Sequence, residues 1–264
     1  MFTLNFNCPI EDVSELKIIL KNKFPDIKSS HLTEAIARGL GFNSHAGLLH
    51  QANLHGKVVI VSNGRAFCEF LEPRHCAVTG ASFYVAVAQI AIRIILRDNQ
   101  KIGLDGYGCG RPKRRPDGKW ENARELYARF LAERSELDTG HSALGFLRSL
   151  TLLQLVPTIK TISTKIGSYG IKHIAEKLTC SFPTGEELGP AYVSNAELIL
   201  AAFHLGLRFR TEIDHLGYDS PNLWFNLSAR SLTDLDCAIR PDGARAQDRR
   251  RKLERDQLSK YIFR

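Results

Sequence analysis

The chain has 264 residues, of which 44% are apolar, 24% charged and 9% aromatic. This is the composition of an ordinary globular protein, and it excludes collagen-like, disulfide-scaffold and intrinsically disordered chains. The net charge is +8, and it comes mainly from two segments: residues 111–119 hold five basic residues and one acid, and residues 240–264 hold nine and four. The rest of the chain is close to neutral, so these two segments are the candidate contacts for a polyanion.

No secretory leader is recognised in residues 1–17, which lack a basic start followed by an apolar run. We therefore expect a cytoplasmic protein. The six cysteines are scattered along the chain, which favours reduced thiols over a disulfide framework. Cys68, His75, Cys76 and Cys109 are zinc-ligand types, but their spacing does not form the two ligand pairs of a structural zinc site, so no metal and no cofactor are predicted.

Residues 10–55 are predicted to form three short helices. The first spans residues 10–23, where apolar side chains recur at helical spacing. Ser30 and Ser44 are the expected N-caps of the second and third, and Gly41 is expected to end the second. Two helices joined at Gly41 could be a DNA-reading helix-turn-helix or a structural hairpin. The third helix has no lysine or arginine for phosphate contacts, which favours the structural hairpin.

The same region carries a resemblance. LTEAIARGLGFNSHAGLL, residues 32–49, resembles a short helical module that accompanies glyoxalase-related and uncharacterised proteins of bacterial plasmids and other mobile elements. The resemblance implies a helical module and a mobile-element setting. It brings no catalytic residue, and the metal-ligand pattern of a glyoxalase is not recognisable downstream.

The middle of the chain is predicted to contain a strand at residues 57–61, a turn at Asn63–Gly64 and a buried helix at residues 81–96. This apolar stretch has 16 residues and includes Gln89 and Arg93, which is short of the roughly 20 apolar residues that cross a bilayer. No membrane association is therefore expected.

Residues 101–120 are predicted to form a flexible loop rich in glycine and proline. The loop does not end in the lysine and serine or threonine of a P-loop. It carries a basic run flanked by Tyr107 and Trp120, which suits contacts to phosphates and bases, although a solvated loop has the same composition. The candidate nucleic-acid contacts in it are Arg111, Lys113, Arg114 and Arg115.

Further helices are predicted at residues 121–137, 141–155, 169–178 and 194–207, with a possible domain boundary near Pro157. Ser194 or Asn195 is the expected N-cap of the last of these, with Glu197 in its first turn. Residues 223–227 are expected to be a short strand or turn, and Arg208 and Arg210 alternate with apolar residues as in a strand.

The richest polar cluster is KTISTKIGSYGIKHIAE, residues 160–176. It enters a helix near Ser168, whose free N–H groups favour an anion. We expect phosphate contacts from Lys160, Lys165, Lys172 and His173. Two alternatives stay open: a capped structural helix, or a phosphate-directed enzyme in which His173 acts as general acid or base beside Tyr169, Lys172 or Glu176.

A second resemblance covers the region from Lys160 to Ser231. SYGIKH, YVSNAELILAAFHLGL and SPNLWFNLS resemble an uncharacterised family of plasmids and integrated elements. It implies a shared fold and genomic setting and no established activity.

The last 25 residues are predicted to form a charged helix or a disordered tail, either ordering on an acidic partner or remaining a solvated terminus. Its candidate nucleic-acid contacts are Arg249, Arg250, Arg251 and Lys252.

Together these observations predict a mainly α protein with a few short strands (α+β). Four ranges are expected: a helical N-terminal module (1–100), the basic loop (101–120), an α-rich C-terminal domain (121–235) and a basic tail (236–264). The predicted function is a nucleic-acid-binding accessory or regulatory protein of a bacterial mobile element, with DNA as the first candidate ligand. The alternative is an interaction module that meets an acidic protein partner in a transfer or defence complex, and an enzyme is the less favoured class.

Overall fold

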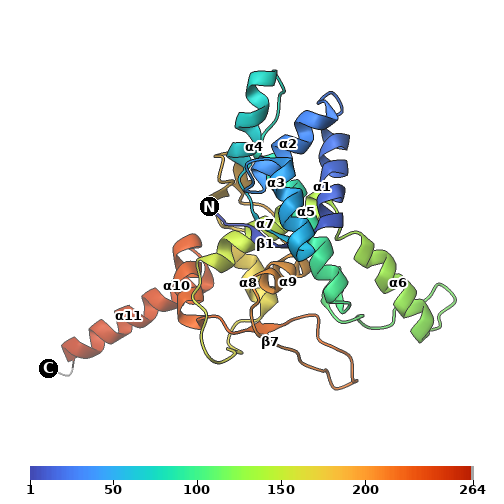
Figure 1. The fold of residues 1–264 in the computed structure, drawn as a ribbon. Helices are drawn as coiled ribbons and strands as arrows, with labels where there is room; N and C mark the ends of the chain where they lie inside the picture. The colour runs from blue at the N-terminus through green and yellow to red at the C-terminus, as the bar shows by residue number, and fades with distance from the viewer. Residues whose placement is uncertain (263–264) are drawn as a thin grey trace.

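The computed structural model describes the backbone of residues 1–262 and the side chains of residues 1–259. These residues form eleven α-helices and four two-stranded antiparallel sheets (Figure 1). The predicted fold class, mainly α with a few short strands, is therefore confirmed. The last two residues of the predicted tail lie outside the described residues.

The N-terminal part is a two-stranded sheet with three helices between its strands. β1 (Asn5–Pro9) pairs antiparallel with β2 (Lys57–Val61), and α1 (Ile10–Lys23), α2 (Ser29–Gly39) and α3 (His45–His55) connect them. The strand at 57–61 and the three helices are confirmed; β1 was not predicted. Ser44 caps α3 as expected, accepting a hydrogen bond from the Gly47 N–H at 3.1 Å.

Two local predictions in this part are wrong. Lys28, not Ser30, is the N-cap of α2, and no side chain caps that end. The turn expected at Asn63–Gly64 is instead the start of α4 (Gly64–Leu71), because the Asn63 side chain accepts a hydrogen bond from the Ala66 N–H and caps a helix. A short 3₁₀ turn, η1 (Glu72–Arg74), follows.

The centre of the molecule is α5 (Gly80–Asp98), the predicted buried helix, capped by Thr79. By length and composition alone α5 could cross a bilayer, and 67% of its most apolar window is buried in this fold. After α5 come two strands of two residues each, β3 (Ile102–Gly103) and β4 (Gly106–Tyr107), and then α6 (Ala123–Ser135) and α7 (Gly140–Gln154). Both helices lie close to their predicted ranges.

The C-terminal part contains α8 (Ser168–Ala175), β5 (Cys180–Ser181), β6 (Glu187–Gly189) and α9 (Asn195–His204). Ser194 is the N-cap of α9 and forms a reciprocal capping box with Glu197. β7 (Phe209–Arg210) pairs with β8 (Trp224–Phe225); the aromatic and alternating patterns suggested these two strands, but not that they pair. The chain ends with α10 (Ala229–Ile239), which was not predicted, and the charged helix α11 (Ala244–Ile262).

One hydrophobic core holds these elements together. Its buried residues run from Phe2 to Leu232, and α7 packs against both α5 and α9. The core is therefore continuous across Pro157. Two helices stand outside it: α6 and α11 project from opposite sides of the lower part of the molecule (Figure 1). Phe130 is the one buried residue of α6, and Ala246 is the one buried residue in the described part of α11.

Candidate nucleic-acid interface

The basic segment at 111–119 forms a short hairpin rather than an irregular flexible loop. Arg114 and Trp120 make an antiparallel bridge, and the Arg115 N–H donates to the Lys119 carbonyl at 2.8 Å. Gly118 has a φ of +81°, which favours glycine at this turn. Arg129 of α6 donates to the carbonyl of Arg111 at 3.0 Å, so the base of the hairpin is fixed to the helix.

Acidic residues compensate most of the charge predicted for this hairpin. Arg111 pairs with Asp214 at 2.6 Å, Lys113 with Glu133 at 3.1 Å, and Arg115 with Glu125 at 2.8 Å. Arg115 also contacts Asp117. The sequence suggested a free patch of four cations here, but three of these four side chains already have a carboxylate partner.

Two cations of the hairpin make no ion pair with any described residue: Arg114, predicted from the sequence, and Lys119, which was not singled out. The Arg114 guanidinium lies 5.8 Å from the centroid of the Trp120 ring. Trp120 is 64% exposed, so the hairpin presents an aromatic ring beside the uncompensated Arg114 guanidinium.

Lys160 and Lys165 lie on an extended segment that runs beside β8. The Ile159 N–H donates to the Asn226 carbonyl at 2.8 Å, and the Ser168 N–H donates to the Leu223 carbonyl at 2.7 Å. These bonds fix the backbone while both lysine side chains stay exposed. They also occupy the Ser168 N–H, one of the groups from which the sequence suggested an anion site.

Lys172 and His173, from the same predicted cluster, have a different environment. Lys172 is 5% exposed, and its Nζ donates to Glu176 Oε1 at 2.8 Å and to the Val193 carbonyl at 3.3 Å. His173 Nδ1 lies 2.7 Å from Glu176 Oε2. Burial alone would raise the pKa of Glu176, but the hydrogen bonds from Lys172 and His173 lower it. Lys172 is thus buried in an ion pair with Glu176 and is almost closed to solvent.

The structure brings together basic residues from two segments that are distant in sequence. A shallow cleft of about 480 Å³ lies where the 160s segment meets α10 and α11. It is lined by four cations, two carboxylates and two uncharged residues: Lys165, Arg230, Arg249, Lys252, Asp234, Asp248, Ala229 and Thr233. Lys165 and Lys252 make no ion pair within the described part of the chain, whereas Arg249 binds Asp234 at 2.6 Å.

The turn between α10 and α11 is fixed by one carboxylate. Asp236 is 2% exposed and binds Arg240 at one oxygen and Arg245 at the other, the latter at 2.8 Å. This double contact sets the direction in which α11 leaves the body. It therefore places Arg249 and Lys252 opposite Lys165, and leaves Arg250 and Arg251 exposed on α11.

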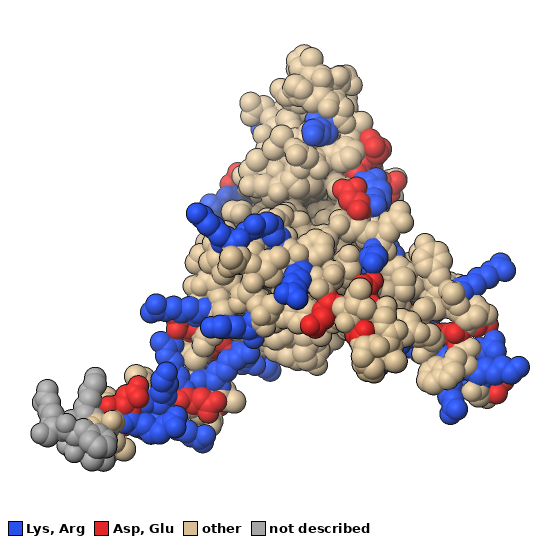
Figure 2. Space-filling model, turned by 90° about the horizontal axis from the view of Figure 1, so that it is seen from below, with Lys and Arg blue, Asp and Glu red and all other residues tan. Residues whose placement is uncertain are grey.

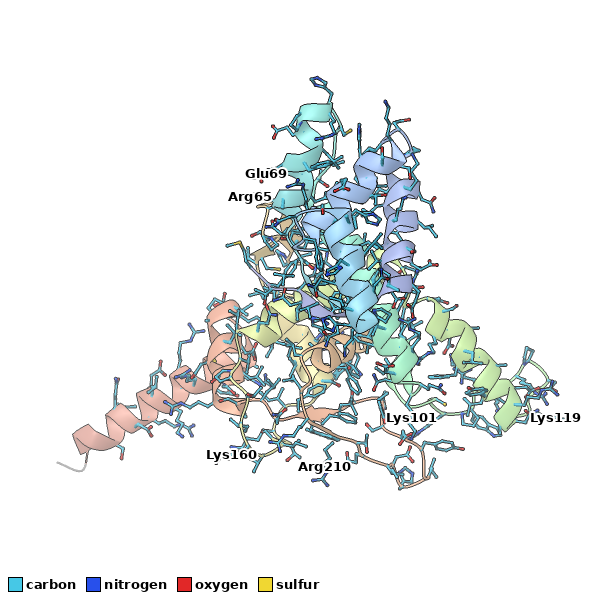
Figure 3. All side chains as sticks on the ribbon, in the orientation of Figure 1. Arg65, Glu69, Lys101, Lys119, Lys160 and Arg210 are labelled. Carbon is cyan, nitrogen blue, oxygen red and sulfur yellow. The ribbon has the colours of Figure 1, made fainter. Side chains whose placement is uncertain are left out.

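The two basic elements lie at opposite ends of one face. Figure 2 shows lysine and arginine side chains gathered at both ends of the molecule seen from below, over α11 and over the hairpin. In Figure 3 the labelled side chains of Lys160, Arg210 and Lys101 lie along this lower edge, and Lys119 lies at its far end. Arg65 and Glu69 are on the upper part, away from it. We call this lower surface, which runs from α11 past Lys160 and Arg210 to the hairpin at 111–119, the basic face.

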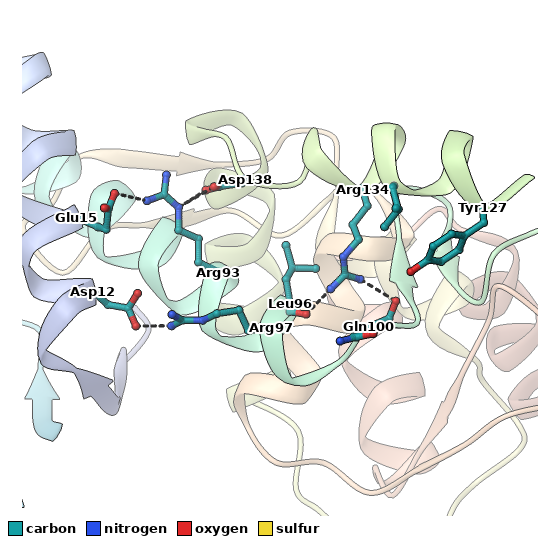
Figure 4. Close-up of a pocket in the computed structure, with 10 residues that line it drawn as sticks. Asp12, Glu15, Arg93, Leu96, Arg97, Gln100, Tyr127, Arg134 and Asp138 are labelled. Atoms are coloured by element: carbon teal, nitrogen blue, oxygen red, sulfur yellow. Dashed lines mark hydrogen bonds and ion pairs between the residues drawn. The ribbon is translucent and has the colours of Figure 1, made fainter. Parts of the chain in front are cut away.

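A separate cavity of about 650 Å³ lies between α1, α5 and α6 (Figure 4). Its charges are matched: Arg93 binds Glu15 and Asp138, and Arg97 binds Asp12. Arg134 instead donates to the carbonyls of Leu96 and Gln100 at the end of α5. Each carboxylate that lines the cavity thus has an arginine partner.

No cluster of three His, Cys, Asp or Glu side chains that could hold a metal ion occurs among the described residues, and the six cysteines are free. Comparison with known proteins gave no match to a family model, a curated protein or a solved structure. The resemblances to mobile-element proteins therefore stay predictions.

Proposed function

We propose that this protein binds nucleic acid through the basic face, as an accessory or regulatory protein of a bacterial mobile element. The observation that carries the proposal is the cleft, where Lys165 from one segment and Arg249 and Lys252 from another line the same surface. Side chains that converge from separate segments can contact successive phosphates along a strand.

The charge of the cleft supports a polyanionic ligand. Four cations face two carboxylates, and the two lysines have no carboxylate partner among the described residues. Arg250 and Arg251 of α11 are also exposed and make only long ion pairs, to Asp242 at 4.0 Å and to Asp248 at 3.7 Å. Contacts of this kind are mainly electrostatic, because they release counterions condensed on the phosphate backbone.

The test is fluorescence-anisotropy binding to duplex DNA, single-stranded DNA and RNA of equal length, measured over a salt series. We expect affinity to fall steeply with salt. Lys165→Ala/Lys252→Ala removes two unpaired cations, so the slope of log affinity against log salt should become shallower by about 2 for duplex DNA.

The matched control is Lys28→Ala/Arg65→Ala. It removes the same charge from two exposed residues; Arg65 lies on the upper part of the molecule (Figure 3). We expect this control to leave the salt slope unchanged. Absence of binding to all three nucleic acids at low salt would refute the proposal, and equal losses in both variants would show a non-specific charge effect.

A further inference from the structure

Trp120 is an unusual residue to leave in solvent. It is 64% exposed, although transfer of an indole ring from water to a protein interior is strongly favourable in free energy. Its position is nevertheless fixed, since the bridge to Arg114 and the hydrogen bond between the Glu121 N–H and the Lys113 carbonyl, 3.0 Å long, order the hairpin on both sides of it. The backbone that carries the ring is thus ordered, while most of the surface of the ring stays open to solvent.

The charges around the ring restrict what could cover it. Carboxylates neutralise Arg111, Lys113 and Arg115, so the two remaining cations are Arg114, over the ring, and Lys119, the neighbour in sequence. An aromatic face beside a free cation, with a second free cation at the preceding residue in the chain, matches a flat apolar group joined to an anion. A nucleobase with its flanking phosphates has this chemistry.

We infer that Trp120 is a stacking platform for an unpaired base of single-stranded nucleic acid, with Arg114 and Lys119 contacting the flanking phosphates. The inference rests on the proposed function and adds a strand preference to it. Bases inside a duplex cover one another's faces, so the ring can stack only on a base that is single-stranded or displaced from its helix.

The chain offers a direct spectroscopic test, because Trp120 and Trp224 are its only tryptophans. In a Trp224→Phe variant all tryptophan emission comes from position 120. We expect single-stranded DNA and single-stranded RNA 20-mers to quench this emission on binding. A duplex of equal length, and an abasic strand that keeps the phosphates, should bind by anisotropy without comparable quenching.

Affinity provides a second readout, measured in a chain that keeps its native Trp224. Trp120→Ala should weaken binding to the single strand about tenfold and leave duplex binding within twofold. Trp120→Phe, which keeps an aromatic ring, should recover part of the loss. Tyr127→Ala removes another exposed aromatic ring, one that lines the separate cavity on α6, and should change neither affinity.

The outcomes separate the two proposals. Binding by anisotropy with unchanged emission, or equal quenching by the abasic strand, would overturn base stacking and leave nucleic-acid binding intact. Loss of duplex and single-strand binding to the same extent in Trp120→Ala would also overturn it. No binding to any of these probes would refute the proposed function itself.

Discussion

His204 is a half-buried histidine with no charged partner among the described residues. Its ring contacts the edges or faces of Phe6 and Phe146, with centroids 5.9 and 5.5 Å away. Burial lowers the pKa of His204 to about 4, so the folded protein keeps the ring neutral where an unfolded chain would protonate it. His204 was not a site candidate, and its contacts with two aromatic rings identify it as a packing residue.

This lowered pKa makes stability depend on pH. Between the unfolded value of about 6.5 and the folded value the unfolded state binds more protons, so the free energy of unfolding falls as pH falls. We expect His204 to contribute a loss of about 2 kcal/mol between pH 7 and pH 5. Urea unfolding of the wild type and His204→Phe at both pH values measures it; an equal loss in the two proteins would contradict the assignment.

At the residue scale, the sequence predicted contacts between residues close in the chain, but not the ion pairs and hydrogen bonds between residues far apart in it. The Ser194 cap could be predicted because Ser194 and Glu197 are three residues apart, as in a capping box. The neutralisation of Arg111 could not, because Asp214 is 103 residues away in the chain. The burial of Lys172 could not be predicted either. Its ion-pair partner Glu176 is close in sequence, but the Val193 carbonyl that also accepts a hydrogen bond from its Nζ is 21 residues away.

Among the elements, α11 depends on one carboxylate for its direction. Asp236 binds both Arg240 and Arg245 across the turn before this helix. Asp236→Ala leaves the two guanidinium groups to the solvent, and we expect a loss of about 2 kcal/mol in stability, typical of hydrogen bonds to a charged group. Trypsin should also cleave sooner within residues 249–252.

Limited proteolysis followed by mass spectrometry, together with urea unfolding, checks this. Asp242→Ala is the matched control, because the Asp242 carboxylate is exposed and its pair with Arg250 is 4.0 Å long. It should cost little. If both variants are cleaved at the wild-type rate, Asp236 does not hold α11 in place.

The long helices were predictable because their apolar side chains repeat at helical spacing over several turns, as in α1 and α7. Short elements were not. β1 has five residues and exists because β2, more than 40 positions later, pairs with it in the register Asn5 to Val61. α10 went unrecognised although it carries an apolar stripe: Leu232 is buried, and Leu235 and Ile239 are half-buried against the core at helical spacing.

In the whole molecule, α11 contributes basic side chains and, in its described part, almost no buried surface. Removing residues 244–264 deletes one buried side chain, Ala246, from the described part. We therefore expect cooperative unfolding to persist with a stability loss below about 2 kcal/mol, while duplex DNA binding weakens strongly. Quenching of Trp120 by single strands should persist in a truncated chain that also carries Trp224→Phe, since the hairpin lies at the other end of the basic face.

Circular dichroism and anisotropy on the truncated chain test this separation. A second variant, in which Arg249, Arg250, Arg251 and Lys252 become glutamine, keeps the helix and removes its charge. The two variants should lose duplex affinity alike. If the truncated chain unfolds or aggregates while the glutamine variant stays folded, α11 contributes to the core more than its burial indicates.

The closure of the core across distant parts of the chain bears on how the protein folds during synthesis. The Phe2 ring packs on Phe182, with centroids 6.2 Å apart, and the Thr3 N–H donates to Gln154, 151 residues away. When α5 has left the ribosome but α7 and α9 have not yet been synthesised, the apolar surface of α5 that these two helices bury in the folded protein is exposed to solvent. Such an intermediate is prone to aggregate, so α5 is the segment that a chaperone on the ribosome would have most reason to hold.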